Sequence, residues 1–291
     1  MLSNNNTRLK YLILIFFIGL FSQGCNIVNP HETVPTYVHI DSFAFANKNA
    51  VLVHSLTRSH QITLAWVYYN NNPVGVFDLP CTVPIMATGT GRVQIFPGVA
   101  VDGLNSLTGV YPFYMPDTSL LLVANPGKVY THIPVTDFYQ NVKITPISDF
   151  SAQTNFATSD GNIPMVRVDS AGLNFEGPVG SIYLTNPGVD SSEDSTIFRF
   201  TIPTGSAFIE FDYKCSIPFA VGLRSNLSNV VYFKSYLGGA FATDHWQKFY
   251  LSAADFVAQH QGDTYTFYVK ASLPAGPPGR VLLDNVQLVT Y

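Results

Sequence analysis

Apolar and polar residues alternate with a period of two in many short stretches of this chain. The alternation is clear at residues 37–45 and 62–69, as expected for strands with one buried face. The second stretch enters Asn70-Asn71-Asn72-Pro73 and continues in an alternating run at residues 74–79, which predicts a hairpin. Further short apolar segments follow at residues 92–96, 119–123, 129–134 and 142–144. No long stretch shows the 3.6-residue period of a helix, so the pattern predicts an all-β fold.

The second half of the chain repeats this pattern. Alternating segments occur at residues 207–214, 219–224, 230–237, 247–251 and 264–271. Only residues 253–260 have the spacing of a short helix. A chain of 291 residues is long enough for two domains at about 150 residues each. We therefore predict two β-sandwich domains, at residues 37–146 and 147–291.

The N-terminal segment has the layout of a signal peptide. Arg8 and Lys10 precede an uncharged apolar run at residues 11–21, and Gly24 stands directly before Cys25. The run is shorter than the roughly 20 residues of a membrane-spanning helix. A small residue followed by cysteine resembles a bacterial lipoprotein cleavage site, which implies removal of residues 1–24 and lipidation of Cys25, with residues 25–36 as a tether. The alternative is ordinary signal-peptidase cleavage with no role for Cys25.

The amino-acid composition limits the classes of partner that we expect for this protein. Only 12% of the residues are charged against 47% hydrophobic, and the formal net charge is −4. A nucleic-acid partner is not expected, because there is no basic excess to neutralise phosphates. Cys81 and Cys215 fall in different predicted domains. An exported compartment would permit a disulfide, but two separate thiols are the favoured interpretation.

The sequence contains none of the short motifs that mark common catalytic or metal sites. It has no His-Glu-x-x-His, no Gly-x-Ser-x-Gly and no Cys-x-x-Cys. His54 and His60 are six residues apart in a polar segment that is typical of a solvated loop. Glu210 and Asp212 share one face of a predicted strand, which we interpret as a solvated face. A long-range carboxylate pair stays open, but the protein is predicted not to be an enzyme.

Aromatic side chains are the best candidates for ligand contacts. Tyr111, Phe113 and Tyr114 are flanked by Pro112 and Pro116, which disfavour a long central strand, so a loop could display these rings to a ligand. Tyr232 and Tyr236 are further candidates in the second half. The alternative for each ring is a place in the core, since large aromatics dominate core energetics.

Two parts of the chain resemble known domain families. Residues 65–96, with Leu79-Pro80-Cys81-Thr82-Val83-Pro84, are similar to surface-layer β domains of the PEGA type. Residues 173–291 resemble jelly-roll carbohydrate-binding modules, on Phe175-Glu176-Gly177 near the start and Asp284-Asn285-Val286 in the last strand. The second resemblance implies a structural calcium ion held by Glu176 and Asp284. The alternative is that Asp284 only ends a strand and that residues 190–194 form a charged loop.

With its leader, the whole layout resembles the lipid-anchored β proteins of the Bacteroidota outer membrane. We therefore predict a non-catalytic, lipid-anchored outer-membrane protein that faces the periplasm or the cell surface and binds a glycan or a partner protein. The alternative is a structural accessory subunit of an outer-membrane β-barrel complex for transport, secretion or assembly. A glycan hydrolase is a third alternative.

Overall fold

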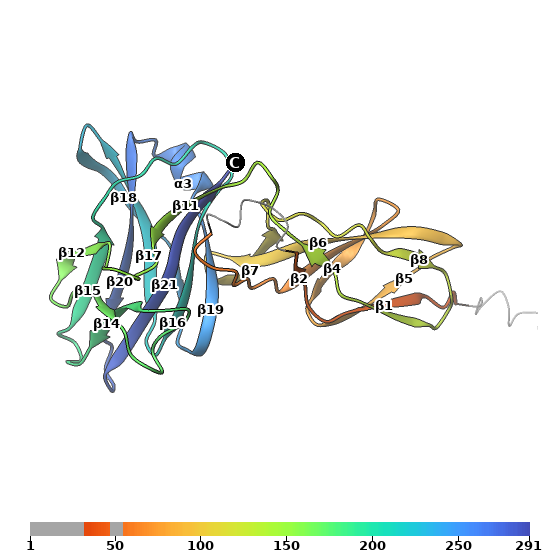
Figure 1. The fold of residues 1–291 in the computed structure, drawn as a ribbon, viewed down its shortest axis with the longest axis horizontal. Helices are drawn as coiled ribbons and strands as arrows, with labels where there is room; N and C mark the ends of the chain where they lie inside the picture. The colour runs from red at the N-terminus through yellow and green to blue at the C-terminus, as the bar shows by residue number, and fades with distance from the viewer. Residues whose placement is uncertain (1–31, 47–54) are drawn as a thin grey trace, which may run out of the picture.

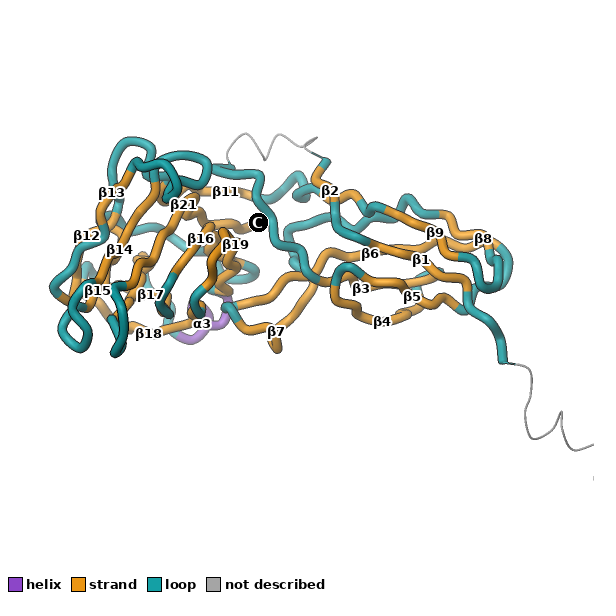
Figure 2. Tube along the Cα trace, turned by 90° about the horizontal axis from the view of Figure 1, so that it is seen from below, coloured by secondary structure: helices purple, strands orange, loops and turns teal. Residues whose placement is uncertain are grey.

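The computed structural model describes residues 32–46 and 55–291 as two β domains placed end to end (Figures 1 and 2). The predicted signal peptide, Cys25 and most of the tether lie outside the described residues. In the described part, no helix combines the length and the apolar character needed to cross a membrane. The all-β prediction is confirmed, and the short helix α3 (Ala254–Gln259) lies inside the stretch predicted as helical.

The first domain consists of small sheets around one core. One sheet has the order β5-β1-β9, and a second has the order β4-β3-β6-β7 with β8 paired to β6. The hairpin expected after residue 69 is present, because β3 pairs with β4 across Asn70 and Asn71, which both have positive φ angles. The strands are β1 (Thr36–Ile40), β2 (Ala44–Phe45), β3 (Leu64–Tyr69), β4 (Asn72–Asp78), β5 (Cys81–Ile85), β6 (Thr90–Val101), β7 (Leu104–Val110), β8 (Leu121–Val123), β9 (Val129–His132) and β10 (Val135–Thr136).

The second domain is an antiparallel β-sandwich of the predicted jelly-roll type. One sheet has the order β13-β14-β21-β16-β19, with β11 also paired to β21, and the other has the order β12-β15-β20-β17-β18. We call them the seam sheet and the outer sheet. The strands are β11 (Lys143–Ser148), β12 (Phe156–Gly161), β13 (Val166–Val168), β14 (Val179–Leu184), β15 (Ser191–Thr196), β16 (Ala207–Cys215), β17 (Phe219–Leu227), β18 (Val230–Ala240), β19 (Thr243–Ser252), β20 (Thr264–Ser272) and β21 (Gly279–Thr290).

The two cores meet at the seam sheet. Alternate residues of β16, such as Ile209 and Phe211, point into the sandwich core. Phe208, Tyr250 and Val289 point the other way and belong to the hydrophobic core of the first domain. The domains therefore share a packed interface, which we call the seam, and the C-terminus lies beside it (Figure 1).

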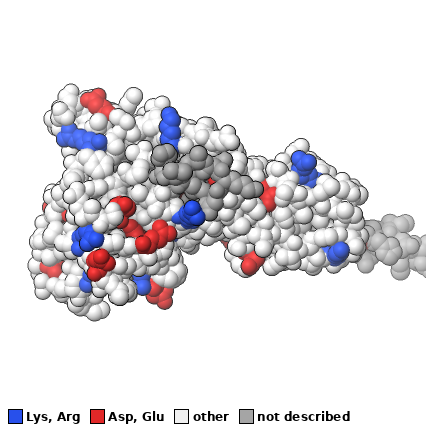
Figure 3. Space-filling model, viewed as in Figure 1, with Lys and Arg blue, Asp and Glu red and all other residues white. Residues whose placement is uncertain are grey.

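The two cysteines of the described residues are separate thiols, as the sequence suggested. Cys81 is partly buried in the first domain and Cys215 is buried in the second, and both are free. Charged side chains are sparse on the visible face of the first domain and more frequent on the second (Figure 3).

Candidate functional site

The loop predicted to display aromatic rings is buried in the seam. Tyr111, Phe113 and Tyr114 are each no more than 2% exposed. The ring centroid of Tyr111 lies 5.2 Å from that of Phe208 and 5.0 Å from that of Tyr250. The prolines do end the strand, but the rings pack against the second domain and are not exposed to solvent. The expectation that these three residues are displayed to a ligand is corrected accordingly.

The same interface buries the carboxylates that were predicted to be solvated. Glu210 and Asp212 are 0% and 1% exposed. Tyr111 donates its hydroxyl to Glu210, and the Gln287 amide donates to Glu210 Oε2 at 3.1 Å. The Lys248 Nζ lies 3.2 Å from the same oxygen. Burial, followed by the charge of Glu210, raises the pKa of Tyr111 well above its ordinary value, so the phenol remains a donor.

A second buried carboxylate lies on the outer sheet, on the face away from the sandwich core. Glu193 in β15 is 1% exposed, and its partner in the register is Lys270 of β20. The Lys234 Nζ lies 2.6 Å from both carboxylate oxygens. Arg224 donates to Glu193 Oε1 and also to the Ser159 hydroxyl at 2.7 Å. Three cations from three strands therefore converge on one carboxylate.

Two tyrosines complete this cluster. The Tyr236 hydroxyl lies 3.4 Å from Glu193 Oε2, and the rings of Tyr236 and Tyr268 are 5.4 Å apart between centroids. The Lys234 Nζ stands 4.8 Å from the centroid of Tyr268, within the range of a cation–π interaction. Gly222 makes room for Tyr268, since a Cβ at that position would lie 2.5 Å from the tyrosine hydroxyl. We call this cluster the tyrosine–cation face: Glu193, Arg224, Lys234, Tyr236, Tyr268 and Lys270.

The two lysines of this face remain accessible, whereas the Arg224 side chain is 14% exposed. The side chains of Lys234 and Lys270 are 33% and 37% exposed, and Tyr236 is 48% exposed. Burial alone would raise the pKa of Glu193, but the hydrogen bonds and charges of Lys234 and Arg224 together outweigh it and hold that pKa below its ordinary value. A hydrogen bond with Tyr236 raises the pKa of Lys270. At neutral pH the face therefore carries three cations around one carboxylate.

Of the five aromatic candidates, Tyr236 belongs to this cluster. Tyr232 lies on the same strand, β18, and is 62% exposed. The sequence analysis missed Glu193, because residues 190–194 were interpreted as a loop, whereas β15 begins at Ser191. The signal for the other members was present: Arg224, Lys234 and Lys270 occupy the polar positions of three predicted alternating strands.

The predicted calcium ligands lie close together, but the described residues do not form a metal cluster. The charges of Glu176 and Asp212 both act on Asp284. The Asn285 amide donates to Glu176 Oε2 at 3.2 Å and to Asp212 Oδ2 at 3.1 Å, so an uncharged donor stands between two of the carboxylates. Among residues 32–46 and 55–291, no group of three or more His, Cys, Asp or Glu side chains has an arrangement that could hold a metal ion. Calcium binding stays a prediction.

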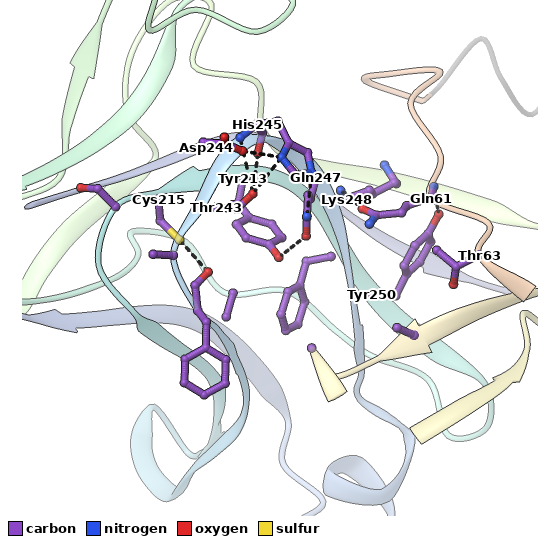
Figure 4. A pocket seen from close by; sticks show the side chains of 17 residues that line it. Gln61, Thr63, Tyr213, Cys215, Thr243, Asp244, His245, Gln247, Lys248 and Tyr250 are labelled. Carbon is purple, nitrogen blue, oxygen red and sulfur yellow. Dashed lines mark hydrogen bonds and ion pairs between the residues drawn. The ribbon is translucent and has the colours of Figure 1, made fainter. Parts of the chain in front are cut away.

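A groove of about 770 Å³ opens where the first domain meets the edge strand β19 (Figure 4). Cys215, His245 and Asp244 line it, which is the composition of a nucleophilic site. However, the Cys215 thiol donates to the carbonyl of Phe241 at 3.2 Å, and burial raises its pKa to about 11. The His245 Nε2 lies 3.0 Å from the Gln247 amide nitrogen. Because the thiol is protonated at neutral pH and the imidazole is engaged elsewhere, the groove assembles no activated nucleophile.

No protein-family model and no curated protein matches this chain. Among solved structures, it is similar to a mutant of a family 29 carbohydrate-binding module, at 12% identity over 52% of this chain and 93% of the module, with a TM-score of 0.36. A second family 29 mutant, solved with mannohexaose, gives 12% identity and a TM-score of 0.34 over 52% of this chain and 93% of its own. A family 30 module from a cellulosomal cellulase of Clostridium thermocellum gives 16% and 0.34 over 50% and 92%. The likeness is too distant to assign a ligand, which has to be argued from the residues themselves.

Proposed function

We propose that this chain is a non-catalytic glycan-binding protein and that its ligand lies on the tyrosine–cation face. The observation that carries the proposal is the placement of Glu193. Its carboxylate is fully buried and fixes Arg224, Lys234 and Lys270 from below, while both lysines and Tyr236 stay accessible from above. Preorganised polar groups beside a half-exposed ring are what a saccharide site requires, since the ring packs against a sugar face and the polar groups fix its orientation.

The charge of the face favours an acidic glycan. The three cations Arg224, Lys234 and Lys270 outnumber Glu193, and Asp160 is a further acid whose charge raises the pKa of Lys270. A positive excess remains after these pairings. Uronate or sulfate groups complement such a surface, and that attraction weakens as salt is added.

The proposal is tested by electrophoresis of the purified protein through gels that contain polysaccharides. A polymer of uronic acids should retard the protein, and Tyr236→Ala should weaken the retardation about tenfold in apparent affinity. Tyr183→Ala is the matched control, because Tyr183 is 44% exposed and has the Arg280 guanidinium 4.1 Å from its ring, but lies on the seam sheet. Absence of retardation by uronic-acid and sulfated polymers, or equal loss in the two variants, would refute the proposal.

We further propose that Cys25 is lipidated and anchors the protein to the outer membrane. The described chain begins at the end of the first domain that is far from the second domain (Figure 1), so an anchor there would hold the tyrosine–cation face away from the lipid. Cys25→Ser should release the protein from membrane fractions. Retention of the variant in those fractions would contradict the anchor.

A further inference from the structure

The groove of Figure 4 has no part in the function proposed above. We infer that it is a second binding site and that it takes a neutral oligosaccharide. Its walls come from both domains: Gln61 and Thr63 belong to the first, and Tyr213 and Gln247 to the second. A volume of about 770 Å³ is within the range of sites that enclose small ligands.

One wall is a fixed chain of hydrogen bonds. The Tyr213 hydroxyl donates to Gln247 Oε1 at 2.8 Å, and the Gln247 amide nitrogen lies 3.0 Å from His245 Nε2. The His245 Nδ1 lies 2.7 Å from Asp244 Oδ1. The Gln247 side chain is therefore held at both of its polar atoms, by Tyr213 and by His245. At the inner end of the wall, the Tyr213 hydroxyl and the Gln247 amide are oriented before a ligand arrives, whereas His245 and Asp244 at the outer end are 69% and 98% exposed.

Among the described residues that line the groove, the only lysine or arginine is buried. The Lys248 side chain is 2% exposed and is paired with Glu210 inside the seam. Asp244 and His245 form their own pair at the mouth. No uncompensated cation faces the groove, in contrast with the tyrosine–cation face. The lining thus suits a ligand that offers hydroxyl groups and no charge.

The groove continues along β19 into a second hollow of about 510 Å³, which shares Gln61, His245 and Gln247 with it. The second hollow is also lined by a cation, Arg58, and an acid, Asp212. This hollow contains the rings of Phe175 and Trp246, with centroids 4.9 Å apart. At the first groove, Phe241 belongs to the lining and is 84% exposed, the highest value among the large apolar side chains. Aromatic side chains at both ends and hydroxyl-binding groups between them favour a chain of several sugar units over a single sugar.

The test is calorimetric titration of the purified protein with neutral oligosaccharides of increasing length. Affinity should rise with length until both hollows are filled. Phe241→Ala should reduce it about tenfold, and Thr63→Val, which removes one hydroxyl at constant volume, about fivefold. Phe198→Ala is the control, because Phe198 is also exposed but lies outside the groove.

The two sites can fail separately. Tyr236→Ala should leave the affinity for neutral oligosaccharides unchanged, and Phe241→Ala should leave retardation by uronic-acid polymers unchanged. The inference is overturned if no neutral oligosaccharide releases or absorbs heat, or if the two groove variants bind like the unmodified protein. Binding of an extended peptide in the groove, with no binding of sugars, would overturn it as well.

Discussion

Glu193 and Glu210 are the same arrangement in two settings. Each is a carboxylate with at most 1% exposure, and each contacts a lysine and a tyrosine hydroxyl on the outward face of a sheet. The two carboxylates differ in what covers their partners. The first domain covers Glu210, and Lys248 beside it is 2% exposed, whereas the lysines around Glu193 are about one third exposed.

The two sites show that a buried acidic group can have enclosed or exposed partners. The exposure of those partners distinguishes the network inside the seam from the proposed binding site. At Glu210 every partner is enclosed, so the network can only hold the domains together. At Glu193 the cations retain open donor positions, because a lysine ammonium has three donors and one carboxylate does not use all of those on two lysines and an arginine.

The largest effect is expected from Glu210→Ala. The substitution leaves the charge of Lys248 buried without its partner, which costs about 3–5 kcal/mol of unfolding free energy. Urea denaturation measures the change. Asp244→Ala is the control, since Asp244 also pairs with a basic side chain but is fully exposed, and its loss should leave the midpoint unchanged. A loss below about 1 kcal/mol for Glu210→Ala would show that the seam network is dispensable.

A third carboxylate, Asp284, extends the comparison because its neighbours are acids instead of cations. Burial raises its pKa to about 7, although backbone donors at Asn285 and Glu176 oppose the rise. In the unfolded chain the group titrates near pH 4. The stability it contributes is therefore full below about pH 4 and is lost as the pH rises through 7. Asp284→Asn should stabilise the fold by about 2 kcal/mol at pH 8.5 and not at pH 4.

Thermal unfolding at the two pH values, in the presence of a chelator, checks this expectation. Equal melting temperatures of the variant and the unmodified protein at pH 8.5 would contradict it. Calcium added in place of the chelator tests the predicted metal site. If Glu176 and Asp284 bind calcium, the ion should raise the melting temperature of the unmodified protein and leave that of Asp284→Asn unchanged.

The sequence predicted the strands well and the exposure of side chains poorly. Alternation assigns residues to one of two faces, and this was correct for Glu210 and Asp212, which do share a face. It does not say whether that face meets solvent or another domain. The predicted exposure of Tyr111 and Tyr114 was wrong for the same reason. The surface that covers these rings comes from strands about 100 or more residues further along the chain.

Glu193 was not predicted as a site residue, for a different reason. The segment at residues 191–194 contains no apolar residue, so it shows no hydrophobic alternation. Its hydrogen-bonding side chains favour loops. In the structure Asp194 accepts from the backbone of Met165 on one side of β15 while Glu193 faces the cations on the other. A strand with polar residues on both faces has no hydrophobic pattern in the sequence, so it is recognised only by its contacts in the folded structure.

The smallest effect on stability is expected from Glu193→Gln. The amide keeps the volume and one acceptor but leaves Arg224, Lys234 and Lys270 without a counter-charge. The cost should be about 1–2 kcal/mol, less than at Glu210, because water reaches the lysines. Salt should restore most of the loss by screening the three cations, and it should restore none of the loss in Glu210→Ala, where the network is sealed. Urea denaturation of both variants at low and high salt measures this contrast, and an equal salt response would show that the two carboxylates share one environment after all.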